Sequence, residues 1–255
     1  MACSQENEAL NAALQTGKSK FENKNFDAAV TEYEKIAKEF PKEAKAHFEL
    51  ANAQTQILKF GSAIDSYTEA IQLDEEYSEA YNGRAILLMG IEKYKESLLD
   101  FDKVIELEGD KSNNYNNRGA LKLKTGDLQG ALNDFSKAIE LDSTNESAHT
   151  HRATVFSLNK EYIKAIKAYD KALSIKTSAP TLNNRGTIRY ELKDIEGAVS
   201  DFELAMKVDP NDPNSPYNLG NIALESFRDY ANAISYYDKA LELSPRHTAS
   251  LINRG

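Results

Sequence analysis

The hydrophobic and polar residues of the chain follow a pattern that repeats about every 34 residues. The sequence Asn-Asn-Arg-Gly at 116–119 returns at 183–186, and its last three residues return at 253–255. Further along, Gly-Ala-Leu-Asn-Asp-Phe at 130–135 matches Gly-Ala-Val-Ser-Asp-Phe at 197–202. A fixed period of about 20–50 residues is typical of repeat proteins, in which each unit is one small supersecondary structure.

Extending the alignment in both directions gives seven consecutive units of 33 to 35 residues and the start of an eighth. Residues 1–9 precede the first unit as an N-terminal extension, and residues 248–255 begin the eighth. Because terminal repeats normally need a cap, we expect the natural chain to continue past Gly255. The seven units cover residues 10–247 and lie at 10–43, 44–77, 78–111, 112–145, 146–178, 179–212 and 213–247.

Each unit predicts two amphipathic helices joined by a tight turn. When the positions of a unit are numbered from 1 to 34, apolar residues stand at 17, 20, 21, 24, 27 and 28. These positions form one stripe along a second helix. Pro41, Pro210 and Pro245 stand at position 32, where proline can end that helix. Small residues at positions 8 and 20 predict a close crossing of the two helices. Position 24 is always aromatic: Tyr33, Tyr67, Phe101, Phe135, Tyr169, Phe202 and Tyr237.

The combination of small residues at positions 8 and 20 with an aromatic residue at 24 resembles the tetratricopeptide repeat. The resemblance covers residues 10–255, although position 4 never carries tryptophan and position 32 lacks proline in four units. It implies an all-α chain, a right-handed superhelical solenoid of antiparallel helix pairs with seven repeats and a partial eighth. In this family the first helices line a concave groove. The resemblance further implies a non-enzymatic scaffold that binds a protein or peptide partner.

Arginine at position 7 has two possible roles. A row of arginines could bind anions, but aspartate occupies position 23 only in units with this arginine. This pairing favours structural salt bridges between the two helices of a unit. Arg152 faces Ala168 instead and is expected to be the free cation. The arginines are Arg84, Arg118, Arg152, Arg185 and Arg254. The predicted pairs are Arg84–Asp100, Arg118–Asp134 and Arg185–Asp201.

Asparagine recurs on the expected groove face of the first helices, although it is a mediocre helix former. A side-chain amide both donates and accepts, so it can bind the backbone of an extended peptide of any sequence. The pattern is similar to the asparagine ladder of O-GlcNAc transferases. Alternatively, these side chains are plain polar surface or bond between adjacent first helices. The predicted peptide-binding residues are Asn52, Asn82, Asn116, Asn117, Asn183, Asn184, Asn218, Asn221, Asn253, Tyr190 and Tyr217.

Other chemistry finds little support. The family's carboxylate clamp needs lysine at position 5 and arginine at position 6, and neither occurs. The net charge of −9 argues against general nucleic-acid binding, since phosphate attraction needs a positive surface. His149 and His151 point in different directions on a helix, so a shared metal is not expected. We therefore expect no catalytic residues, cofactor or metal.

The chain has a single cysteine, Cys3, and the segment Ala-Cys-Ser-Gln at 2–5 resembles the lipidation junction of bacterial lipoproteins. Association with a membrane is expected only if Cys3 is lipidated, because no apolar run is long enough to span a bilayer. A cytoplasmic location is favoured, and the bacterial cell envelope is the alternative. The alternative functions are an envelope-anchored lipoprotein assembly factor or the regulatory repeat region of a longer enzyme.

Overall fold

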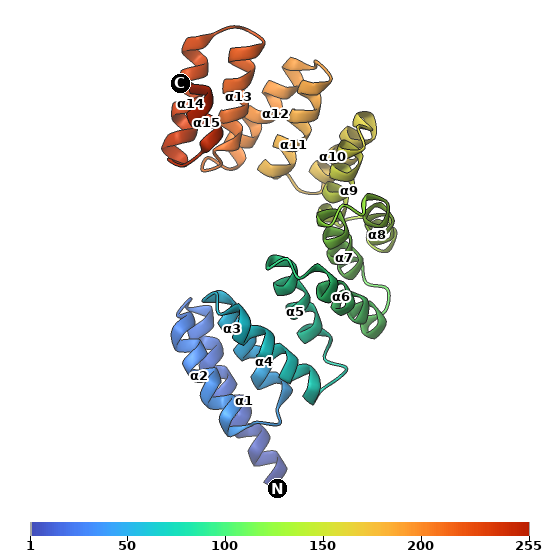
Figure 1. Ribbon diagram of the computed structural model, residues 1–255, viewed down its shortest axis with the longest axis vertical. Helices are drawn as coiled ribbons and strands as arrows, with labels where there is room; N and C mark the ends of the chain where they lie inside the picture. Colours follow the sequence, from blue (N-terminus) through green and yellow to red (C-terminus); the bar gives the residue numbers. More distant parts are fainter. Residues whose placement is uncertain (1, 255) are drawn as a thin grey trace. The chain divides into compact units, whose positions relative to one another are not determined.

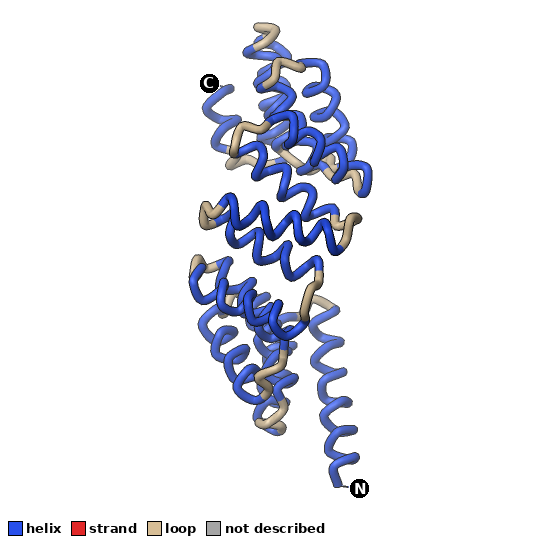
Figure 2. Tube along the Cα trace, turned by 90° about the vertical axis from the view of Figure 1, so that its right-hand side faces the viewer, coloured by secondary structure: helices blue, strands red, loops and turns tan. Residues whose placement is uncertain are grey.

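The computed structural model describes residues 2–254, and describes side chains from residue 8 onward. The described residues form fifteen α-helices joined by short loops, so the all-α prediction is confirmed (Figures 1 and 2). The helices are α1 (Ala2–Glu22), α2 (Phe26–Glu39), α3 (Ala44–Gln56), α4 (Phe60–Leu73), α5 (Ser78–Gly90), α6 (Tyr94–Glu108), α7 (Ser112–Lys124), α8 (Leu128–Leu141), α9 (Glu146–Leu158), α10 (Tyr162–Ile175), α11 (Ala179–Glu191), α12 (Ile195–Val208), α13 (Asn214–Glu225), α14 (Tyr230–Leu243) and α15 (Thr248–Arg254).

The helices belong to two compact units, and the boundary between them along the chain falls in the turn between α7 and α8. The first unit ends at Thr125 and holds α1 to α7, and the second begins at Gly126 and holds α8 to α15. Within each unit, a helix packs against the helices that precede and follow it in the chain. Odd-numbered helices are the first helices of the repeats and even-numbered helices are the second.

The core of a repeat is a small residue beside an aromatic ring. The position-20 residues Ala165 and Ala198 are fully buried, as are the position-24 rings that follow them on the same helix. Glycine at position 8 allows the first helix to approach this ring. A Cβ atom added at Gly186 would lie 2.8 Å from the ring of Phe202. The repeated pattern of small and aromatic residues therefore sets how closely two helices of a pair can pack.

The turn between the helices of a pair has one residue with a positive φ in every repeat. The residue at position 15 has a positive φ, and only in the fourth repeat is it a glycine, Gly126, with φ +84°. In the last repeat, the amide of Asp229 bonds to the carbonyl six residues earlier, Ala223, instead of five. The extra residue of this repeat therefore lies in its turn. The non-glycine residues with positive φ are Lys24, Leu58, Glu92, Lys160, Lys193 and Arg228.

Candidate functional site

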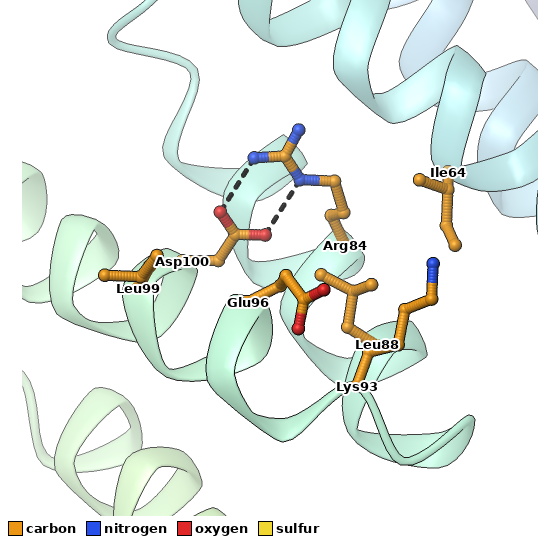
Figure 3. Close-up of a pocket in the computed structure, with 7 residues that line it drawn as sticks. All are labelled: Ile64, Arg84, Leu88, Lys93, Glu96, Leu99 and Asp100. Carbon is orange, nitrogen blue, oxygen red and sulfur yellow. Dashed lines mark hydrogen bonds and ion pairs between the residues drawn. The ribbon is translucent and has the colours of Figure 1, made fainter.

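Two of the arginines at position 7 form bidentate ion pairs with the aspartate at position 23 of the same repeat. Arg84 donates from Nε and Nη2 to the two carboxylate oxygens of Asp100, each at 2.8 Å (Figure 3). Arg185 donates from the same two nitrogens to Asp201 at 3.0 and 2.6 Å. Both aspartates are buried, so each pair ties the first helix of its repeat to the second. The carboxylates raise the pKa values of both arginines against the opposing effect of burial.

The same arginines also reach the repeat before their own, which the sequence reasoning did not anticipate. The acceptor is the residue at position 25 of the preceding repeat, on its second helix. It is Thr68 for Arg84, at 2.9 Å, and Asp170 for Arg185, at 2.6 Å. Arg118 bonds to Asp102 at 2.7 Å, and Arg254 bonds to Asp238 at 2.6 Å. Position-7 arginine is therefore a link between repeats as well as within one.

Arg118 and Arg152 differ from Arg84 and Arg185 in their pairing with position 23 of the same repeat. Arg118 and Asp134 belong to different units, and their pairing stays a prediction; the Asp134 side chain is buried. Arg152 makes no hydrogen bond or ion pair to any residue that the structure describes, and its Nε atom is buried without a partner. Burial lowers the pKa of this guanidinium.

Near Arg84, residues of α4, α5 and α6 line a hollow of about 300 Å³, and Figure 3 draws their side chains. Ile64, Leu88 and Leu99 give it an apolar lining, with the Arg84–Asp100 pair at one wall. Its lining contains none of the residues predicted to bind a peptide.

The groove face of the second unit carries amides on α11, α13 and the start of α15. A hollow of about 530 Å³ lies along these helices, and Asn184, Asn218 and Tyr217 line it. A second hollow of about 250 Å³ adjoins it, shares Thr187 and Asn218, and includes Tyr190. The side chains of Asn184 and Asn218 have no hydrogen-bond partner among residues 2–254. They occupy the same position of two consecutive repeats.

Other amides of this face hold the first helices together. Asn183 is 8% exposed, donates to Asp212 at 2.6 Å and accepts from Ser215 at 3.1 Å. This amide is a structural link between repeats, so we leave it out of the proposed peptide site. Asn221 accepts from Tyr237 at 2.8 Å and from Asn253 at 3.0 Å. The alternative of bonds between adjacent first helices therefore describes these side chains well.

The groove face of the first unit is more apolar. Its hollow of about 610 Å³ is lined by Phe21, Phe48 and Ile86 together with Asn52 and Asn82. Both amides are hydrogen-bonded within the unit. Asn52 accepts from the hydroxyl of Tyr67 at 2.6 Å, and Asn82 accepts from Asn117 at 3.3 Å. The neighbouring Asn116 is half-buried on α7. This groove therefore offers rings and aliphatic chains rather than unpaired amides.

The remaining sequence-based candidates give no reactive site. His149 is 4% exposed, and its Nε2 donates to the carbonyl oxygen of Ser143 at 3.1 Å, so its role is structural. Across the described part of the chain, no group of three or more His, Cys, Asp or Glu residues could hold a metal ion. No helix in that part is long and apolar enough to cross a bilayer. The side chain of Cys3 lies outside the described residues.

Comparison with known proteins identifies the family of the chain. Two models of the tetratricopeptide repeat match, one over residues 14–74 and one over 112–145, 179–212 and 217–247. The human protein "Tetratricopeptide repeat protein 6" is 31% identical over 90 residues, 35% of this chain and 17% of that protein. The "Heat-shock protein cognate (HSC) co-chaperone sgt12" of Aspergillus fumigatus is 36% identical over 97 residues, 38% of this chain and 28% of that protein. The aligned segments thus span less than a third of these relatives' lengths.

A solved structure has the same fold over almost the whole chain. It is a tetratricopeptide repeat protein from Parabacteroides merdae, with a TM-score of 0.78 and 15% sequence identity. The alignment covers 97% of this chain and 98% of that one. At this identity the likeness shows the fold alone.

Proposed function

The chain belongs to the tetratricopeptide repeat family of protein-interaction scaffolds, and we propose that its second unit binds an extended peptide segment of a protein partner without catalysing a reaction. The proposed site is the groove face of α11, α13 and α15. The observation that carries the proposal is the pair of unpartnered amides at Asn184 and Asn218 on consecutive first helices.

The spacing of these amides suits an extended peptide. Packed helices lie about 8–10 Å apart, and an extended chain advances about 3.3 Å per residue. Asn184 and Asn218 would therefore meet backbone groups about three residues apart. Each amide can donate to a peptide carbonyl and accept from a peptide N–H, which requires no particular peptide side chain. Thr187 lines the same hollow, and because its hydroxyl donates to the carbonyl oxygen of Asn183 at 2.9 Å, its oxygen is available as an acceptor.

The charge around the groove favours a neutral or basic peptide. Glu191 and Glu225 line the smaller hollow, and Asp212 lines the larger one. The hydroxyl of Tyr190 donates to Glu225 at 2.8 Å, which holds that carboxylate at the groove edge. A peptide with Lys or Arg beside its bound backbone would meet complementary charge, whereas an acidic peptide would be repelled.

The test begins with selection of peptides of about 12 residues from a random displayed library against the intact chain. The dissociation constant of a selected peptide is then measured by calorimetry for the wild type and for Asn184→Ala/Asn218→Ala. Each lost hydrogen bond is worth about 0.5–1.5 kcal/mol, so we expect binding to weaken about tenfold or more.

The matched control is Asn133→Ala, an exposed amide on the second helix α8 that bonds only to Gln129 in the same helix. This variant should bind the peptide as the wild type does. If the double variant also binds unchanged while its circular dichroism spectrum stays native, the amides are not the peptide site and the proposal fails.

Lipidation at Cys3 and attachment to an enzyme stay predictions. Either is compatible with the same groove chemistry. The natural reading frame on both sides of residues 1–255 distinguishes them, since a lipoprotein needs a basic start and an apolar segment before the cysteine.

A further inference from the structure

The junction between α8 and α9 departs from the arginine links found at four other junctions. At position 25 the preceding repeat normally supplies an oxygen acceptor, and the distances to the arginine of the next repeat are 2.6–2.9 Å. Before Arg152, this position is Ser136, an exposed residue on α8. The acceptors at the other junctions are Thr68, Asp102, Asp170 and Asp238.

Arg152 lacks the second acceptor too. Position 23 of its own repeat is Ala168 rather than aspartate. Its guanidinium consequently has no partner within residues 2–254, although its Nε atom is cut off from solvent. A desolvated cation without an anion is unfavourable, so an anion placed beside it would be stabilised.

We propose that Ser136 is a phosphorylation site and that its phosphate completes the ion pair with Arg152 between α8 and α9. The register places the Ser136 hydroxyl where Thr68 offers its own hydroxyl oxygen to Arg84 at 2.9 Å. A phosphate on this oxygen extends further toward the guanidinium and carries three strong acceptor oxygens. The side chains of Asp102 and Asp170 at equivalent positions are about half exposed (51% and 49%), so this surface is accessible.

The modification requires a protein kinase and a nucleoside triphosphate. The Ser136 Oγ forms a bond to the γ-phosphorus, the bond from that phosphorus to its bridging oxygen breaks, and nucleoside diphosphate leaves. The hydroxyl proton passes to a base of the kinase. The product adds about −1.5 to −2 charges. The carboxylate one turn further along α8, Glu140, is already paired with Lys137 at 3.2 Å, which reduces its repulsion of the phosphate.

The link between α8 and α9 would therefore depend on modification. At the junctions before Arg84, Arg118, Arg185 and Arg254 the acceptor is built into the sequence. At the junction before Arg152 the unmodified Ser136 hydroxyl makes no bond to the arginine in the described part of the chain, so the link would form only after phosphorylation. Phosphate at Ser136 would therefore stiffen the packing of α8 on α9 in response to a kinase.

The first experiment installs phosphoserine at position 136 during translation and measures urea unfolding of the full chain. We expect the folding equilibrium constant to rise about 5- to 10-fold, and the rise to disappear in Arg152→Gln. Phosphoserine at the exposed Ser200 of α12 is the control and should give no such dependence on Arg152. An equal gain in Arg152→Gln, or none in the wild type, would overturn the proposal.

Three further measurements test the pairing, the identity of the occupant and the modification itself. Position-25 acceptors bond to Nη1 of Arg84, Arg118 and Arg185, so the Nη–H signals of Arg152 in nitrogen NMR should shift with phosphoserine at 136. Unchanged Nη–H signals contradict the pairing. Inorganic phosphate added at millimolar concentration should not reproduce the gain in stability, since a gain equal to that from phosphoserine would assign the site to a free ion. In protein isolated from its own cells, the tryptic peptide 125–137 should carry phosphate on Ser136. Its recovery only in unmodified form across growth conditions would refute the modification.

Discussion

Burial decides what each aspartate contributes to the stability of its arginine link. The side chain of Asp201 is 2% exposed and serves both Arg185 and Arg189, whereas the side chain of Asp170 is 49% exposed. Removing one partner of a buried pair leaves an uncompensated charge, but a surface pair contributes little.

We predict that Asp201→Ala lowers the free energy of unfolding by about 3 kcal/mol, because it removes the buried carboxylate that two arginines share. Asp170→Ala should lower it by less than about 1 kcal/mol. Urea denaturation of both variants checks this. Similar losses in the two would mean that burial does not set the strength of these links.

A second prediction concerns acid and His149. Burial lowers the pKa of this ring from its ordinary value of 6.5. The unfolded chain then binds more protons in mild acid, so stability decreases as the pH falls below about 6.5. The melting temperature should decrease between pH 7.5 and pH 5.5 by less in His149→Gln than in the wild type. A steeper dependence in the variant would show the opposite sign. The ring of His151, whose pKa burial also lowers, keeps part of the effect.

Sequence reasoning at this scale identified residue pairs within a repeat but missed those between repeats. The signal for the latter was present: Asp102, Asp170 and Asp238 each precede a repeat that has arginine at position 7. It was harder to predict which amides are bonded within the protein, because Asn183 and Asn184 are the same residue type and adjacent in sequence. Only the packing of α11 on α13 shows that the first is buried and bonded and that the second is exposed.

At the scale of the helix pair, small residues at the crossing matter most. Ala165 of α10 is fully buried in a cluster with Ala153, Tyr169 and Ile188. We predict that Ala165→Leu lowers the free energy of unfolding by about 1–3 kcal/mol, because the added atoms force the two helices apart. Ser174→Leu, on the exposed side of the same helix, is the control and should stay within about 0.5 kcal/mol. Thermal unfolding of both variants measures the difference.

The pairing of helices was predictable because the apolar stripe and the aromatic residue at position 24 recur in every repeat. The place of the extra residue in the last repeat was less so. The length of residues 213–247 alone does not say where the extra residue lies, and the structure has it in the turn before Tyr230. A turn accepts an additional residue without shifting a helix face, whereas an insertion within a helix would rotate its apolar stripe by about 100°.

For the whole molecule, the contacts between neighbouring helices predict that a destabilising substitution affects nearby helices rather than the whole chain. Repeat proteins are stabilised by each repeat and its interfaces with the next. Phe202→Ala should remove about 3–5 kcal/mol from the second unit, where this ring is 2% exposed. Hydrogen exchange should accelerate across α11 to α13 and stay unchanged in α1 to α4. Uniform acceleration over the chain would show that it unfolds as one cooperative block.

The six side chains at position 15 imply that this scaffold could be made more heat-resistant without altering its binding face. An L-amino acid in the left-handed region is disfavoured by about 1–2 kcal/mol, which exceeds the entropic penalty of about 0.5–1 kcal/mol for glycine. Gly126 shows that the turn accepts glycine. Replacing Lys24 and Lys160 by glycine offers additive gains in thermostability. Lys193 is kept, because its ammonium lies 5.6 Å from the ring centroid of Tyr190, which lines the smaller hollow.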